Sequence, residues 1–273
     1  MKTRIIAAAV LLPLLLLMLL WLPEYVAAIV MALLAAVAAY EMLHRTRLVR
    51  NGRLVIYSAV MAAALSIWSY FGAMEAYGYF LLIAFCVALF TEMMRDHVKV
   101  RFETLAMCFV AGAGVPYMLS SLIRILMSHN GRHVVLIPFV IAFLADTGAY
   151  FVGLRFGRHK LAPVVSPNKT IEGVLGGLAA SVVGMLIYAL IMQLVMDYRV
   201  NYALAILYGF AGCLAGVFGD LCFSIIKRQT GIKDYGNLIP GHGGVLDRLD
   251  SMVLVAPLME AFLTLMPLAE EVW

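Results

Sequence analysis

Apolar runs long enough to cross a lipid bilayer recur from one end of this chain to the other, and they constrain its fold more than any other feature. Of the 273 residues, 64% are hydrophobic and only 13% are charged, whereas soluble proteins are usually about 25% charged. A helix needs roughly 20 apolar residues to span the hydrocarbon core of a bilayer. The sequence therefore predicts an all-α polytopic membrane protein.

We expect about nine transmembrane helices, since each run approaches the length that a bilayer requires. The runs are Ile5–Leu22, Tyr25–Tyr40, Leu54–Gly72, Ala76–Phe90, Thr104–Met127, Val134–Gly153, Ile171–Met196, Tyr202–Ser224 and Ser251–Leu268. The second and the fourth are short. The first follows Lys2 and Arg4 and resembles a signal peptide, but it is long for one and more spans follow, so we interpret it as an uncleaved helix.

Basic residues orient these helices, because cytoplasmic loops of membrane proteins are enriched in lysine and arginine. With the N-terminus in the cytoplasm, all but three of the 20 basic residues fall in cytoplasmic segments. The exceptions are Arg124, Arg132 and Arg199. The sequence thus predicts a cytoplasmic N-terminus and a C-terminus on the outside.

Unusual polar residues concentrate in the second half of the chain. We therefore expect residues 1–130 to form a transmembrane scaffold and residues 131–273 to form a catalytic half, both within one integrated membrane domain. Glycines also recur in the second half, for example in the GxxxG pair Gly212 and Gly216. We interpret most of these glycines as sites where membrane helices pack closely.

Five carboxylates of the second half lie in or beside the predicted spans, where charge is costly and usually functional. They are Asp146, Glu172, Asp220, Asp247 and Asp250. The orientation set by lysine and arginine brings all five near the cytoplasmic face. Carboxylate oxygens suit Mg²⁺, which binds a few carboxylates together with substrate phosphates. The alternative is that each carboxylate simply pairs with a nearby lysine or arginine.

Polar segments beside these carboxylates suit phosphate groups. We expect Ser166 to cap the seventh span, with Pro167 at the first helical position, so that the positive end of that helix faces the same site. The alternative is a plain polar loop. The turn at residues 241–244 is rich in glycine, which lets backbone approach a ligand closely. Its His242 is either a ligand or proton carrier, or only a hydrogen-bond partner of its surroundings.

The segment from Ser224 to Asp250, called the signature segment below, resembles the signature of the phosphatidate cytidylyltransferases, or CDP-diglyceride synthases. Every fixed position of that signature is matched, by Ser224, Lys227, Arg228, Lys233, Asp234, Gly236, Pro240, His242, Gly243, Gly244, Asp247, Arg248 and Asp250. Residues 145–150 and 166–173 resemble two further motifs of the family. The resemblance covers the C-terminal half in detail and the N-terminal half only as generic spans.

This resemblance implies that phosphatidate attacks the α-phosphorus of CTP, which forms CDP-diacylglycerol and releases pyrophosphate. It also implies dependence on Mg²⁺, with room for a second cation. It implies a multi-pass enzyme of the inner (plasma) membrane, surrounded by membrane lipid, with its active site facing the cytoplasm. We expect a homodimer and no nucleic-acid partner.

The resemblance also suggests roles for individual residues. We expect Asp220 and Asp247 to be the main metal ligands, with Asp250 or Asp146 nearby. The residues expected to hold the triphosphate or the lipid head group are Lys227, Arg228, Lys233 and Arg248, with His242 also at the catalytic site. The residues expected to contact substrate are Ser166, Asn168, Lys169, Thr170, Glu172, Ser224, Asp234, Gly243 and Gly244.

Two other functions stay open at this point. An ion-coupled transporter would also explain carboxylates in membrane spans, but it predicts acidic residues near mid-membrane in both halves and an internal repeat, which the sequence does not display. A CTP-dependent lipid kinase would transfer the γ-phosphate of CTP and release CDP. The pattern of the CDP-alcohol phosphotransferases is absent from the sequence.

Overall fold

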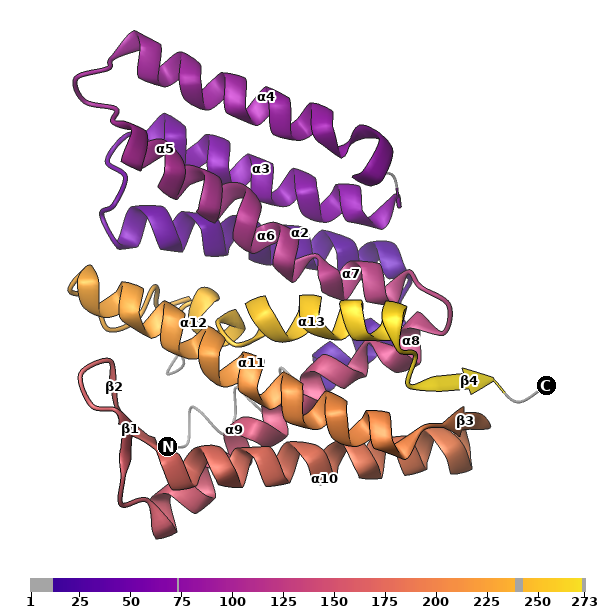
Figure 1. The fold of residues 1–273 in the computed structure, drawn as a ribbon. Helices are drawn as coiled ribbons and strands as arrows, with labels where there is room; N and C mark the ends of the chain where they lie inside the picture. The colour runs from indigo at the N-terminus through magenta and orange to yellow at the C-terminus, as the bar shows by residue number, and fades with distance from the viewer. Residues whose placement is uncertain (1–11, 73, 239–242, 272–273) are drawn as a thin grey trace. The chain divides into compact units, whose positions relative to one another are not determined.

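The computed structural model describes residues 12–72, 74–238 and 243–271. Within these ranges helices dominate, and seven of them are long and apolar enough to cross a membrane (Figure 1). The chain is therefore an all-α, multi-pass membrane protein, as predicted. Its residues form two compact units, one of Met1–Arg132 with Lys227–Leu249 (unit 1) and one of His133–Ile226 with Asp250–Trp273 (unit 2).

Each predicted span falls on helical structure. Of the first, residues 12–20 are helical and the part before Leu12 lies outside the described residues. The second and fourth spans were predicted too short, because polar residues such as Glu41 and Glu92 continue their helices to Arg45 and Arg95. The ninth contains a helix of only 14 residues. The count of nine and the orientation of the termini stay predictions.

Unit 1 consists of helices that follow one another closely along the chain. They are α2 (Glu24–Tyr40), the π-helical turn η1 (Glu41–Arg45), α3 (Gly52–Tyr70), α4 (Met74–Arg95), α5 (Phe102–Phe109), η2 (Val110–Gly114), α6 (Val115–Leu119) and α7 (Ser121–Leu126). The unit also holds the short helix α12 (Leu246–Leu249) of the signature segment. The segment that carries most of the signature thus packs with the N-terminal half.

Small residues bring the helices of unit 1 together. Helices α2 and α3 lie side by side (Figure 1) and share a core at Ala35, Ala39 and Ala62, each at most 2% exposed. A Cβ atom at Gly112 in η2 would lie 2.9 Å from the Cα atom of Ser58 in α3, so only glycine permits this approach. Close backbone contact is the usual means by which helices associate in lipid.

Unit 2 combines long helices with two short antiparallel strand pairs. After α8 (Gly131–Val134), which begins at the end of unit 1, its elements are α9 (Leu136–Phe156), β1 (Lys160–Ala162), β2 (Ser166–Thr170), α10 (Ile171–Val195), β3 (Tyr198–Val200), α11 (Tyr202–Gln229), α13 (Met252–Leu265) and β4 (Ala269–Glu271). Strand β1 pairs with β2, and β3 with β4. The last residues of α11, from Lys227, belong to unit 1.

Glycines let the helices of unit 2 pack with their backbones close. A Cβ atom at Gly177 in α10 would lie 2.7 Å from the carbonyl oxygen of Ala145 in α9, and one at Gly212 in α11 would lie 2.9 Å from the Ile141 side chain. Helices α9 and α10 make the most extensive helix contact of the unit. The interpretation of these glycines as packing positions is confirmed.

The start of α10 differs from the prediction. Ser166 does not cap this helix and Pro167 is not its first residue, because residues 166–170 form strand β2, paired with β1. The cap is Thr170, whose hydroxyl accepts a hydrogen bond from the backbone N–H of Gly173. The strand pairing uses backbone groups that a helix starting at Pro167 would need, so the helix begins at Ile171, four residues after Pro167.

Candidate functional site

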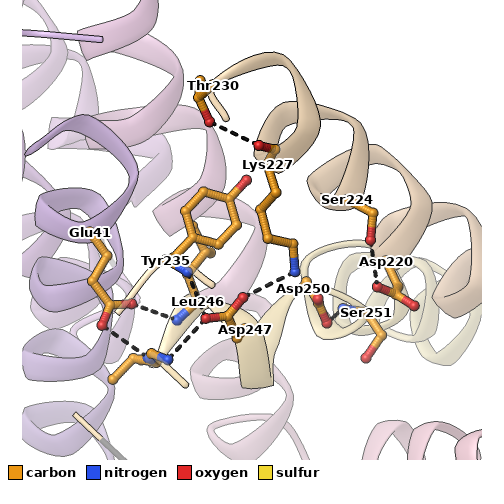
Figure 2. A network of polar contacts seen from close by, with 12 residues as sticks. Glu41, Asp220, Ser224, Lys227, Thr230, Tyr235, Leu246, Asp247, Asp250 and Ser251 are labelled. Carbon is orange, nitrogen blue, oxygen red and sulfur yellow. Dashed lines mark hydrogen bonds and ion pairs between the residues drawn. The ribbon is translucent and has the colours of Figure 1, made fainter. Parts of the chain in front are cut away.

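Asp247, in the signature segment, is a buried carboxylate that accepts hydrogen bonds from three donors. It lies in α12 and is 6% exposed. Its Oδ1 atom accepts from the Lys227 ammonium at 3.0 Å. Its Oδ2 atom accepts from the backbone N–H groups of Tyr235 at 2.8 Å and Gly244 at 2.9 Å, as Figure 2 shows. Three donors from separate parts of the segment therefore fix one carboxylate.

A second buried carboxylate, Glu41, lies beside this turn. It comes from the π-helical turn η1 and is 4% exposed. Its two oxygens accept from the backbone N–H groups of Val245 at 3.2 Å and Leu246 at 3.0 Å (Figure 2). The residues of the signature segment thus bond to a residue of the first half of the chain that the sequence analysis did not select.

The glycines of the turn have a structural reason to be glycine. Gly243 has a φ of +86°, in the left-handed region that side chains disfavour. A Cβ atom at Gly244 would lie 2.5 Å from both carboxylate oxygens of Glu41. The predicted contacts of these two glycines with substrate stay predictions. His242, the predicted catalytic histidine, lies outside the described residues.

Most of the remaining charged residues of the signature segment in unit 1 lie on its surface. Arg228, Lys233, Asp234 and Arg248 are all exposed. Lys227 differs from them, because its side chain is only 13% exposed and its ammonium lies 5.4 Å from the centre of the Tyr235 ring. The fold therefore holds the Lys227 ammonium in a defined place, between the Asp247 carboxylate and the Tyr235 ring.

Unit 2 holds a second carboxylate and lysine pair. Lys169, on strand β2, forms an ion pair with Asp220 on α11. The Ser224 hydroxyl, one turn further along α11, donates to the Oδ1 atom of Asp220 at 3.2 Å (Figure 2). Both side chains of the ion pair are partly accessible, at 24% for Lys169 and 30% for Asp220, so the pair can be reached by a ligand.

A cavity of about 270 Å³ adjoins this pair. Its polar walls come from Asp146 on α9, Asn168 and Lys169 on β2, Thr170, and Ser251 before α13. Much of its remaining wall is glycine and alanine. The structure thus brings the three upstream residues Asn168, Lys169 and Thr170 to the same cavity as Asp146.

Two predicted residues of unit 2 have other partners. Glu172 accepts from the His159 ring nitrogen at 2.6 Å and from the backbone N–H of Arg158 at 3.1 Å, so it holds the chain between α9 and β1. Asp250 is 9% exposed and accepts from the backbone N–H of Ser251. Ser166 is partly buried on β2. The substrate roles of Ser166 and Glu172 stay predictions.

The four predicted metal ligands belong to two units, with Asp146, Asp220 and Asp250 in unit 2 and Asp247 in unit 1. Among the residues that the structure describes, no three histidine, cysteine, aspartate or glutamate side chains form a metal-binding group. Asp220 and Asp247 each pair with a lysine, as the alternative interpretation expected. A carboxylate has room for further partners, and Mg²⁺ takes one or two carboxylates with phosphate and water, so the oxygen donors fit Mg²⁺ in chemistry.

Glu41 is a buried carboxylate that contacts the signature segment and that the sequence does not single out. The sequence predicts that the second span ends at Tyr40, which places Glu41 in a loop. A carboxylate in a membrane helix is a functional signal, and the helical structure continues through Glu41 to Arg45. Glu41 therefore carries the same signal as the carboxylates of the second half.

Comparisons with known proteins agree with the signature. The sequence model of the Cytidylyltransferase family matches residues 2–266. A phosphatidate cytidylyltransferase of Staphylococcus haemolyticus is 40% identical over 184 residues, 67% of this chain and 68% of that protein. One of Staphylococcus aureus is 39% identical over 181 residues, 66% of each chain. The aligned region thus spans about two thirds of these relatives, and the chain is a membrane-embedded nucleotidyltransferase that belongs to the cytidylyltransferase family.

Proposed function

We propose that this protein is a phosphatidate cytidylyltransferase that forms CDP-diacylglycerol from CTP and phosphatidate. One observation supports the proposal above others. The signature segment folds so that Asp247, buried, receives the Lys227 ammonium and two backbone N–H groups. Such an arrangement fixes a carboxylate that can bind a metal ion beside an ammonium group that can bind phosphate. The names of the relatives supply the substrates.

The reaction needs no side chain that attacks the substrate. An oxygen of the phosphatidate phosphate, already an anion at neutral pH, bonds to the α-phosphorus of CTP. The bond from that phosphorus to the oxygen bridging to the β-phosphate breaks, and pyrophosphate leaves. The protein therefore has to align two anions and reduce their repulsion.

The side chains divide this work. Lys169, on the wall of the unit 2 cavity, is a donor for CTP phosphates, with Asn168 and Thr170 beside it. Lys227 is a donor for phosphate near Asp247. Arg228, Lys233 and Arg248 are exposed, and we assign them to the lipid head group or the triphosphate. Charge-assisted bonds to phosphate are among the stronger hydrogen bonds in proteins.

We propose Mg²⁺ as the cofactor, with Asp220 and Asp247 as the main candidate ligands and Asp146 and Asp250 as further candidates. When bound, Mg²⁺ supplies positive charge that neutralises the phosphates of CTP. The proposal places the reaction at the cytoplasmic face of the plasma membrane, consistent with the lysine and arginine distribution. A homodimer stays an expectation.

A labelling experiment tests the reaction. Purified protein is given phosphatidate, Mg²⁺ and CTP labelled at either the α- or the γ-phosphate. We expect α-label in the lipid and γ-label in released pyrophosphate. The γ-label in lipid would instead identify a lipid kinase. The absence of both labels from lipid, in protein that is folded and binds CTP, would reject the nucleotidyl transfer.

A further inference from the structure

The turn that carries Asp247 is bonded to two carboxylates at once. Its consecutive backbone N–H groups divide between them. Gly244 donates to Asp247 itself at 2.9 Å, whereas Val245 and Leu246 donate to Glu41 at 3.2 and 3.0 Å (Figure 2). The position of Asp247 therefore depends on a turn whose next two amides are held by Glu41.

The surroundings of Glu41 match its carboxylate on two sides, at its own helix and at the signature segment. Glu41 lies in the π-helical turn η1, which directly continues α2 and ends at Arg45. Facing it are two glycines of the signature segment. A Cβ atom at Gly244 would lie 2.5 Å from its oxygens, and a Cβ atom at Gly236 would collide with its Oε1 atom. Neither glycine has a positive φ among the described residues, so the space they leave for Glu41 explains them better than backbone conformation does.

The chemistry of this contact favours a carboxylate. Among the described residues no lysine or arginine forms an ion pair with Glu41, and its partners are backbone N–H groups. A glutamine has only one accepting oxygen, so its NH₂ group would face one of the two amide donors. A buried donor without an acceptor is costly, and the turn would have to shift to relieve it.

We propose that Glu41 is a positioning residue for Asp247, which acts through the turn at residues 244–246 and does not contact substrate. The inference rests on the proposed role of Asp247 in cytidylyl transfer. It assigns to the N-terminal half a part in the reaction, because α2 and η1 supply the anchor that the signature segment needs. Misplacing a reacting group by about 1 Å can cost on the order of 100-fold in rate.

The test compares Glu41→Gln with Glu92→Gln in purified enzyme. Glu92 is a matched control, since it is also 4% exposed and lies near the end of a unit 1 helix, but its partners are the side chains of Tyr57, Arg53 and Arg95. For Glu41→Gln we expect kcat to fall by about 10- to 100-fold, with the KM values for CTP and phosphatidate within about threefold. For Glu92→Gln we expect kcat within about twofold of the wild type. Equal losses in the two variants, or a normal kcat in folded Glu41→Gln, would overturn the proposal.

Hydrogen–deuterium exchange tests the contact without relying on activity. It also keeps the proposal testable if one variant fails to fold. In the wild type, the amides of Val245 and Leu246 should exchange slowly, and rapid exchange there would refute the contact. In Glu41→Gln, the peptide covering residues 244–249 should exchange faster, while Glu92→Gln should leave it unchanged. Gly244→Ala, which intrudes on Glu41 from the other side, should reproduce the kcat loss, and a normal kcat would count against the proposal. If the wild type itself lacks activity, the proposed function fails while the exchange data still judge the contact.

Discussion

Replacing Asp247 with asparagine separates the chemical role of this carboxylate from its structural role. An asparagine offers one oxygen, which the backbone donors of Tyr235 and Gly244 would occupy. Its NH₂ group would then face the Lys227 ammonium, which now lies 3.0 Å from the carboxylate. The substitution removes a negative charge and leaves a largely buried cation beside a donor.

The cost to stability follows from this geometry. Two unit charges 3.0 Å apart attract by about 5 kcal/mol at an effective dielectric constant of about 20, and desolvation of both groups offsets part of that energy. Removing one member of a buried pair usually costs about 3–5 kcal/mol. The Lys227 side chain is 13% exposed and so is not fully desolvated. We therefore expect Asp247→Asn to lower the free energy of unfolding by about 3 kcal/mol, at the low end of this range.

A double variant resolves the two effects. Lys227→Met alone should lower turnover, and Asp247→Asn alone should lower both turnover and melting temperature. Combining Asp247→Asn with Lys227→Met removes both charges, so most of the lost stability should return, as replacing whole ion pairs with apolar groups often allows. Turnover should remain at least about 100-fold below the wild type.

The assay is transfer of α-label from CTP to lipid, paired with a thermal unfolding curve in the same detergent. A double variant that is stable and turns over within tenfold of the wild type would show that neither the Asp247 carboxylate nor the Lys227 ammonium is required for turnover. The reasoning would also fail if Asp247→Asn had a normal melting temperature, since the ion pair would then contribute nothing.

Three further predictions concern unit 2. Lys169→Met should raise the KM for CTP by about tenfold or more and change the melting temperature little, because partly exposed ion pairs contribute about 0–1 kcal/mol; an unchanged KM would remove Lys169 from the CTP site. Thr170→Ala should cost about 1 kcal/mol through loss of the α10 cap, seen as a lower melting temperature, whereas Thr170→Ser should retain the cap and most of the stability. Gly148→Val should destabilise the α9–α10 contact, since even a Cβ atom there would lie 2.6 Å from the Gly176 carbonyl oxygen; wild-type thermal stability in that variant would contradict the packing.

Much of the architecture is readable from the sequence, for a physical reason that lipid imposes. Backbone N–H and C=O groups in a bilayer must be paired within the chain, so a long apolar run forms a helix whatever its neighbours do. The runs at residues 54–72, 134–153 and 171–196 accordingly fall on α3, on α8 with α9, and on α10. The family signature is similarly local, because its residues occupy one continuous segment.

Other features depend on residues that are far apart in the chain, and only the tertiary structure decided them. Glu41 meets Val245 across 204 positions, and Lys169 meets Asp220 from a strand that the sequence suggested would be a loop or the start of a helix. Hydropathy cannot specify such contacts, because it reports how much a residue prefers lipid and not which partner it finds. The sequence by itself determined which long apolar segments are helical and, through the signature, which family the chain resembles. The packing within unit 1 brought Glu41 to the amides of Val245 and Leu246, and the packing within unit 2 brought Lys169 to Asp220. Hydrogen bonds require atoms within about 3 Å, which sequence spacing does not provide.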